Sequence, residues 1–140
     1  MIGYLSELVQ IEEVITTAAA AAATSTSAAV NMAGFDGCAF VGSISAAGAG
    51  SLAKAQQSAT SGGTYVDLEG TSQPLTTNTR FIIDIQNPGK QFLKCIVIRG
   101  TSVVLGGIWA IRYRGKSLAQ SQAGALLGLE KFVSPAEGTA

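Results

Sequence analysis

The sequence predicts an all-β protein: an antiparallel β-sandwich of jelly-roll-like type with an extended N-terminal arm and a C-terminal tail. Three observations lead to this fold class. Apolar and polar residues alternate in short segments, most clearly in residues 80–86. Glycine-rich turns separate these segments; in the turn at 87–89, proline presets φ and glycine accepts a positive φ. The sequence shows no alternation of strands with helical segments, which argues against an α/β fold.

The chain divides into three parts by composition. Residues 1–27 are expected to form the arm, residues 28–117 the sandwich core, and residues 118–140 the tail. At 140 residues the chain is long enough for one domain with a single core, and too short for two.

The arm is ambiguous in its secondary structure. Apolar residues recur there at helical spacing, namely Tyr4, Leu8, Ile11 and Ile15. The threonines and serines on both sides of the alanine run at 18–23 favour extended chain instead. We expect an extended arm that docks on a neighbouring molecule, with a short helix as the alternative.

The expected strands of the core are rich in apolar residues and are bounded by turn residues. They are residues 28–32, 38–45, 52–57, 64–68, 80–86, 92–99 and 103–113. In the 80–86 segment, Phe81, Ile83 and Ile85 face one way, and Ile82 and its alternate neighbours face the other.

Two further features concern the ends of the core. Gly106 and Gly107 interrupt the last strand and predict a bulge or a bend there. In the tail, residues 129–133 fit a final strand, and residues 134–140 show no apolar period.

Composition argues against several classes of function. The chain has no histidine, which is the commonest general base and transition-metal ligand. Nine basic and nine acidic residues cancel, so no overall field attracts nucleic acid or an anionic membrane. No apolar run is long enough to cross a membrane. Cys38 and Cys95 lie in apolar runs and are expected to be reduced and buried, with a disulfide as the less favoured alternative.

One segment of the chain matches a catalytic motif, and the match is of low specificity. The Ser-Leu-Ala-Lys segment at 51–54 fits the S-x-x-K pattern of serine β-lactamases. That chemistry needs Ser51 and Lys54 one helical turn apart, whereas a strand points them to opposite faces. The carboxylates lack the spacing of a calcium loop: Asp36, Asp67, Glu69 and Asp84. We therefore expect no catalytic, cofactor-binding or metal-binding residue.

Charge is distributed unevenly along the chain. The first fifteen residues carry three acids, Glu7, Glu12 and Glu13. Residues 80–116 contain one acid and seven basic residues: Arg80, Lys90, Lys94, Arg99, Arg112, Arg114 and Lys116. One interpretation is a solvated strand face. The other is that the acidic arm of one subunit meets the basic sheet of another subunit or of a partner protein, where complementary charge fixes orientation.

Several blocks of the sequence resemble small virion proteins of tailed phages. They are Met-Ala-Gly-Phe-Asp-Gly at 32–37, Leu-Ala-Lys-Ala-Gln-Gln at 52–57, Ile-Trp-Ala-Ile-Arg-Tyr at 108–113 and the closing segment 132–140. The strand, proline turn and strand at 81–99 are also similar, with Lys90 and Lys94 after the proline. The resemblance covers about residues 28–140 and implies a capsid cement (decoration) protein.

This resemblance implies a protein that lies on the outer capsid surface, reinforces contacts between subunits and catalyses no reaction. Its expected partners are the major capsid protein and further copies of itself, as a dimer or trimer, with no direct nucleic-acid or membrane contact and no cofactor. It would be made in the cytoplasm of a host bacterium and end in the virion. The alternatives are another virion component, of the tail, vertex or fibre, and a carbohydrate-binding β-sandwich module, which needs an exposed aromatic platform.

Overall fold

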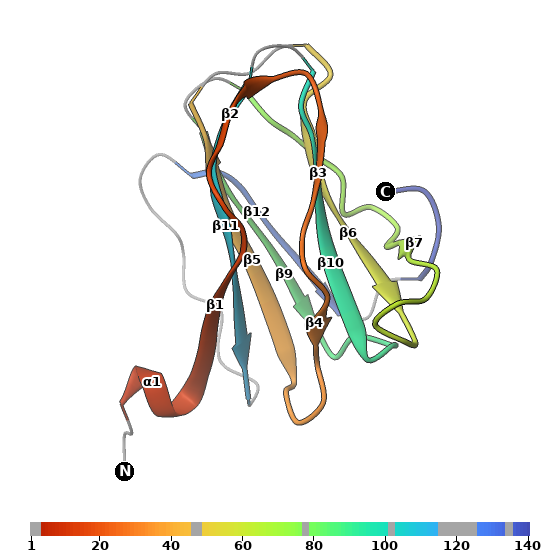
Figure 1. Ribbon diagram of the computed structural model, residues 1–140. Helices are drawn as coiled ribbons and strands as arrows, with labels where there is room; N and C mark the ends of the chain where they lie inside the picture. The colour runs from red at the N-terminus through yellow and green to blue at the C-terminus, as the bar shows by residue number, and fades with distance from the viewer. Residues whose placement is uncertain (1–3, 46–48, 77–78, 101–102, 115–125, 134–135) are drawn as a thin grey trace.

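The computed structural model of the chain consists of two β-sheets packed face to face (Figure 1). The structure describes residues 4–45, 49–76, 79–100, 103–114, 126–133 and 136–140. A single helical turn, α1 (Leu5–Leu8), precedes the first strand. The predicted all-β sandwich is confirmed.

Each sheet is built from strands that are distant in sequence. Sheet A contains β1 (Val9–Ile15), β2 (Ala18–Ala21), β5 (Gly37–Ile44), β9 (Thr79–Gln86), β11 (Val103–Tyr113) and β12 (Leu126–Val133). Sheet B contains β3 (Thr24–Thr26), β4 (Val30–Asn31), β6 (Leu52–Ser58), β7 (Val66–Asp67), β8 (Gln73–Pro74) and β10 (Phe92–Ile98). The order in sheet A is β1-β11-β5-β9-β12, with β2 also on β11. The order in sheet B is β3-β10-β6-β7, with β4 on β10 and β8 on β6.

The core lies between the two sheets, where every second side chain of each strand points inward. Phe81, Ile83 and Ile85 of β9 are fully buried, as their alternation predicts. They share one apolar cluster with Leu93 and Val97 of β10, which reach the core from the opposite sheet. Cys38 and Cys95 belong to the same cluster and are free thiols, as expected.

The N-terminal segment is part of the sandwich, which corrects the expectation of an arm that docks on a neighbour. β1 and β2 pair with β11 in sheet A, and β3 pairs with β10 in sheet B. Figure 1 shows the segment crossing from one sheet to the other. The backbone is extended as predicted, but its partners lie in the same chain. Without this segment, β10 and β11 would each leave an edge with unpaired backbone groups.

The helical alternative for this segment holds only for α1. The alanine run forms β2 instead, because its backbone pairs with β11 at Val103 and Leu105. None of the helices in the described residues has the length and apolar character that a membrane crossing requires.

The final strand begins earlier than predicted, and it runs parallel to its neighbour although the sandwich was predicted to be antiparallel. β12 begins at Leu126 and runs parallel to β9, whereas the other strand pairs of the described residues are antiparallel. The last residues lie against sheet B, where Glu69 N donates to Ala136 O at 2.8 Å and Gly138 N donates to Asp67 O at 3.0 Å. The part of the expected tail at 118–125 lies outside the described residues.

The predicted bulge in β11 is confirmed. The register with β5 shifts between Leu105 and Ile108, and Gly107 has a φ of 87°. A positive φ is available to glycine without steric cost, so Gly107 permits the bend.

Candidate interaction surface

Among the described residues, two surfaces gather exposed apolar side chains, and they are the candidates for a functional site. The S-x-x-K segment is not such a site, because its two side chains have separate structural partners. Ser51 is buried, and its Oγ accepts a hydrogen bond from Gly100 N at 3.0 Å. Lys54 Nζ binds Asp67 Oδ2 at 2.7 Å. No group of three or more Cys, Asp or Glu side chains that could hold a metal occurs in the described part of the chain.

The first surface is the outer side of sheet A. Strand pairing places Glu13, Trp109, Val41 and Ile82 in one row across β1, β11, β5 and β9. The row beside it consists of Ile11, Ile111, Ala39 and Asp84. Since paired residues share a face, the apolar members of these rows lie together on the outside. We call this surface the apolar face, made of Val9, Ile11, Val41, Ile82, Trp109 and Ile111.

The apolar face is accessible to a partner. Trp109 is 44% exposed and Ile11 is 50% exposed. Val41, Ile82 and Ile111 are half-buried. A strand with one solvent-facing side ordinarily carries polar residues there, so a continuous apolar outer face indicates contact with another surface.

A tyrosine that lies across the sheet forms the polar end of the apolar face. Tyr113 Oη of β11 donates to Asp84 Oδ1 of β9 at 2.6 Å. To reach it the ring passes over Gly37 of β5, where a Cβ would overlap the tyrosine ring. Burial and the neighbouring Asp84 carboxylate raise the pKa of the Tyr113 phenol above its ordinary value. The phenol therefore remains a hydrogen-bond donor at neutral pH.

The second surface is the N-terminal anchor, made of Tyr4, Leu5 and Leu8 on and beside α1. These side chains are 79%, 66% and 52% exposed. Figure 1 shows α1 projecting away from the sandwich beyond the start of β1. Tyr4 N donates to Glu7 Oε2 at 3.1 Å, and this contact orders the turn that presents the apolar side chains.

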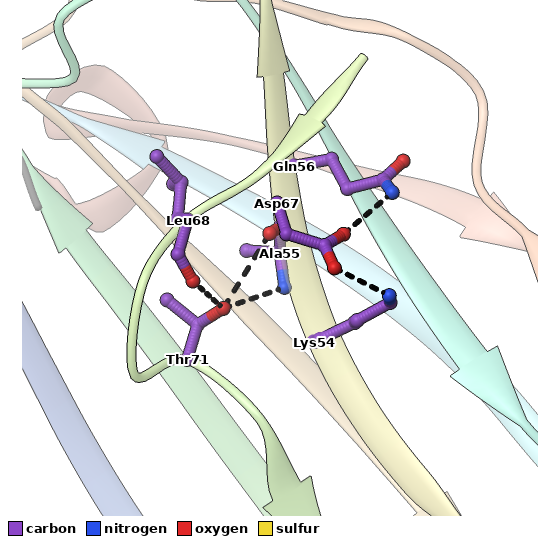
Figure 2. A network of polar contacts seen from close by, with 6 residues as sticks. All are labelled: Lys54, Ala55, Gln56, Asp67, Leu68 and Thr71. Carbon is purple, nitrogen blue, oxygen red and sulfur yellow. Dashed lines mark hydrogen bonds and ion pairs between the residues drawn. The ribbon is translucent and has the colours of Figure 1, made fainter. Parts of the chain in front are cut away.

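The outer side of sheet B has a different character, because polar contacts occupy it. Figure 2 shows Asp67 of β7 accepting hydrogen bonds from Lys54 Nζ and Gln56 Nε2 of β6, both at 2.7 Å. Lys94 Nζ lies 4.2 Å from the centre of the Tyr65 ring. Polar side chains with hydrogen-bond or ring partners therefore cover the outer side of sheet B, whereas the outer side of sheet A carries the apolar face.

Two of the residues predicted to lie at an interface are internal. Arg99 and Arg112 are each only 8% exposed. Arg99 Nη1 donates to Ala19 O at 2.9 Å, and Arg112 Nη1 donates to Asn31 O at 2.7 Å. Arg99 therefore contacts β2 of the N-terminal segment, and Arg112 of β11 links sheet A to β4 of sheet B.

The other predicted interface residues lie nearer the surface. Glu12 pairs with Arg112 of its own chain at 3.5 Å, so this acid and base meet within one molecule. Lys90 pairs with Glu137 of the C-terminal segment. Lys94 covers Tyr65, and Arg114 lies 5.6 Å from the centre of the Phe35 ring.

Glu7, Glu13 and Arg80 are exposed. Glu13 and Arg80 form none of the ion pairs found among the described residues. Both lie on the outer side of sheet A, since Glu13 pairs with Trp109 and Arg80 pairs with Ser43.

Charge alone did not identify the apolar face. The signal in the sequence was Ile82, an apolar residue on the side of its strand that carries Arg80, Asp84 and Gln86. The spacing of Ile11 in the sequence predicted a helix. Its place beside Trp109 follows only from the strand pairing of Ile11 with Ile111.

No protein-family model matches the chain, and neither a curated protein nor a solved structure matches it significantly.

Proposed function

We propose that this chain is a virion structural protein that binds the outer surface of a phage capsid and reinforces contacts between major capsid protein subunits. The observation that carries the proposal is the N-terminal anchor, a projecting turn whose apolar side chains Tyr4, Leu5 and Leu8 are all more than half exposed. Such side chains are stabilised when a partner surface covers them. The resemblance of residues 28–140 to phage cement proteins supplies the class of partner.

The physical mechanism follows from linkage. A protein that binds only the mature shell stabilises that state by mass action. Many copies on one lattice contribute together, so modest contacts at each site add to a large effect on the particle. The anchor suits this role because it stands clear of the sandwich and can enter a depression between capsid subunits (Figure 1).

Phage heads stripped of this protein provide the test. Adding back the purified full-length chain is expected to restore binding and to raise the melting temperature of the heads in calorimetry. The double variant Leu5→Asp with Leu8→Asp is expected to lose both effects, because it places charge where apolar contact is needed. The matched control is Ala59→Asp, an exposed position in a turn of sheet B. Heads that melt at the same temperature with and without bound protein would contradict the reinforcing role.

A carbohydrate-binding function is the second candidate, and the open indole of Trp109 favours it. An aromatic ring on a flat sheet can stack on a sugar ring, which presents apolar C–H groups to it. A glycan array with the full-length chain tests this candidate, with Trp109→Ala as the control. Absence of binding on the array, or equal binding by both proteins, would contradict it.

A further inference from the structure

The N-terminal anchor and the apolar face of sheet A are separate surfaces in the described part of the chain. α1 precedes Val9, the residue at one end of the face, so the helix lies beyond the rows that contain Trp109 and Ile111. The face therefore extends over four strands, from β1 to β9, with apolar side chains in the middle.

We propose that two copies of the chain pack these faces together about a twofold axis that runs parallel to the strands, between β5 and β11. This proposal deepens the proposed function by naming a second copy of the chain as a partner, but it uses a different surface from the capsid contact. Sheets packed face to face lie about 10 Å apart with their strands nearly aligned, which this arrangement reproduces.

The sizes of the side chains fit this axis. Rotation about it places β11 of one copy over β5 of the other, so the large residues Trp109 and Ile111 lie opposite Val41 and Ala39. Large side chains thus meet smaller ones in both halves of the interface. Alternation of this kind lets two faces interdigitate, and aromatic residues near the centre of an interface carry much of its binding energy.

The charges at the margins of the face fit the same axis. Rotation places β1 of one copy over β9 of the other, because β1 lies next to β11 and β9 lies next to β5, at equal distances from the axis. Glu13 lies in the row of Ile82, and Arg80 is two residues further along β9, about 7 Å away. Both side chains can span that separation. Twofold symmetry makes two such Glu13–Arg80 pairs, one on each side of the apolar centre.

The alternative orientation fits less well. An axis in the same plane but perpendicular to the strands places β1 over β1, so that Glu13 of one copy approaches Glu13 of the other. That arrangement also places β9 over β9, so no Glu13 meets an Arg80 of the other copy. Like charges opposite each other oppose association, whereas the strand-parallel axis neutralises all four. The carboxylate of Asp84 accepts a hydrogen bond from Tyr113 Oη, so it has a partner within its own chain.

Sedimentation velocity on the full-length chain tests the proposal over a wide range of protein concentration. The wild-type chain is expected to sediment as a dimer. Trp109→Lys is expected to weaken the dimer at least about 30-fold, in keeping with loss of a central aromatic residue. Ala59→Lys is the control for added charge away from the face and should leave the dimer unchanged. Circular dichroism and cooperative urea unfolding establish that each variant is folded.

Charge reversal tests the axis itself. Glu13→Arg alone and Arg80→Glu alone each create two repulsive pairs and are expected to weaken the dimer at least about tenfold. The double variant Glu13→Arg with Arg80→Glu restores opposite charges in both pairs and should recover dimerisation. A monomeric wild-type chain, a dimer insensitive to Trp109→Lys, or a double variant as weak as the singles would each overturn the proposal.

Head binding separates this proposal from the proposed function. A wild-type dimer that fails to bind stripped heads would contradict the capsid role and leave the dimer intact. A wild-type monomer that binds and stabilises heads would contradict the dimer and leave the capsid role intact.

Discussion

The hydroxyl of Thr71 closes a gap in the hydrogen bonding of sheet B. β7 pairs with β6 at Gln56 and Gln57, and β8 pairs with it at Leu52 and Ala53, which leaves Ala55 between them. Figure 2 shows how the gap is filled: Thr71 Oγ1 accepts from Ala55 N at 3.1 Å and donates to Leu68 O at 2.8 Å. Thr71 is fully buried, so water does not replace it.

We expect Thr71→Val to lower the free energy of unfolding by about 1–3 kcal/mol, because it leaves a buried backbone N–H without a partner. Urea denaturation followed by circular dichroism measures the change. Thr71→Ser keeps the hydroxyl and is expected to lose less. Equal stability of Thr71→Val and wild type would show that the buried hydroxyl does not support sheet B.

Gly37 is the second position where one atom decides local structure. A Cβ there would overlap the ring of Tyr113, which must cross β5 to bond Asp84. We expect Gly37→Ala to displace the ring and to destabilise the fold by about 1–3 kcal/mol, the usual effect of overpacking. Thermal unfolding measures this, and the bond to Asp84 can be checked by Tyr113→Phe.

The control for Gly37→Ala is Gly62→Ala. No atom lies within 4 Å of a Cβ built at Gly62, which is exposed. We expect this variant to unfold at the wild-type temperature or slightly above it, since alanine restricts the unfolded chain. A Gly37→Ala protein as stable as Gly62→Ala would contradict the close approach of the Tyr113 ring.

At the scale of elements, short strands with few backbone bonds depend on side-chain contacts. β7 is two residues long and is held to β6 by the contacts of Asp67 with Lys54 and Gln56 (Figure 2). The C-terminal segment adds to the same strand, where Leu68 bridges to Glu137 and Gln57 Nε2 donates to Glu137 Oε1 at 3.2 Å. β7 is therefore enclosed between β6 and the end of the chain.

The Asp67 contacts predict a dependence of stability on pH. Burial raises the pKa of Asp67, but the hydrogen bonds from Lys54 and Gln56 outweigh burial and hold the pKa below its ordinary value of 3.8. A carboxyl whose pKa is lower in the folded state stabilises the fold above its unfolded pKa, and this stabilisation disappears as pH falls through the folded pKa.

We expect Asp67→Asn to be less stable than wild type at neutral pH, and the difference to shrink as the pH is lowered below about 4. Urea midpoints of both proteins across an acid series measure this difference. Glu69→Gln, at an exposed position after β7, serves as the comparison for loss of a carboxylate elsewhere. A gap between wild type and Asp67→Asn that stays constant with pH would contradict the role of the ionised Asp67.

At the scale of the whole molecule, the sandwich has a closed interior and two unlike exteriors. The interior contains both thiols, Cys38 and Cys95, which are fully buried. Burial raises the pKa of Cys38 above its ordinary value and that of Cys95 to about 12. The thiolate, which is the reactive form, is therefore scarce in the folded protein at neutral pH.

We expect neither thiol to react with Ellman's reagent in the folded protein, and both to react rapidly in urea. Because both thiols lie in the shared core, their slow labelling in native buffer should have the same rate and follow global unfolding. Colorimetric release of thionitrobenzoate measures it. Labelling of one thiol much faster than the other would show local opening of one sheet, contrary to this expectation.

Local features of the chain were predictable from the sequence, whereas the neighbours of each strand were not. Residues 80–99 were placed correctly as two strands around a turn, because alternation is a local signal. The turn chemistry was wrong in one respect, since the positive φ there belongs to Asn87, at 49°, and not to Gly89. The apolar face was not predicted, since period-two alternation tells which residues share a face of one strand and not which strands are neighbours. Glu12 and Arg112 illustrate this: their pairing joins residues about a hundred positions apart.

The sequence by itself determined the fold class, the inward residues of the long strands, the bulge at Gly107 and the reduced state of the two cysteines. Tertiary structure decided that the N-terminal segment pairs with its own sheets and that β12 runs parallel to β9. It also decided that Arg99 and Arg112 are internal. The reason is physical: local backbone preference acts over a few residues, whereas strand neighbours and burial are set by free energies of contact between distant parts of the chain.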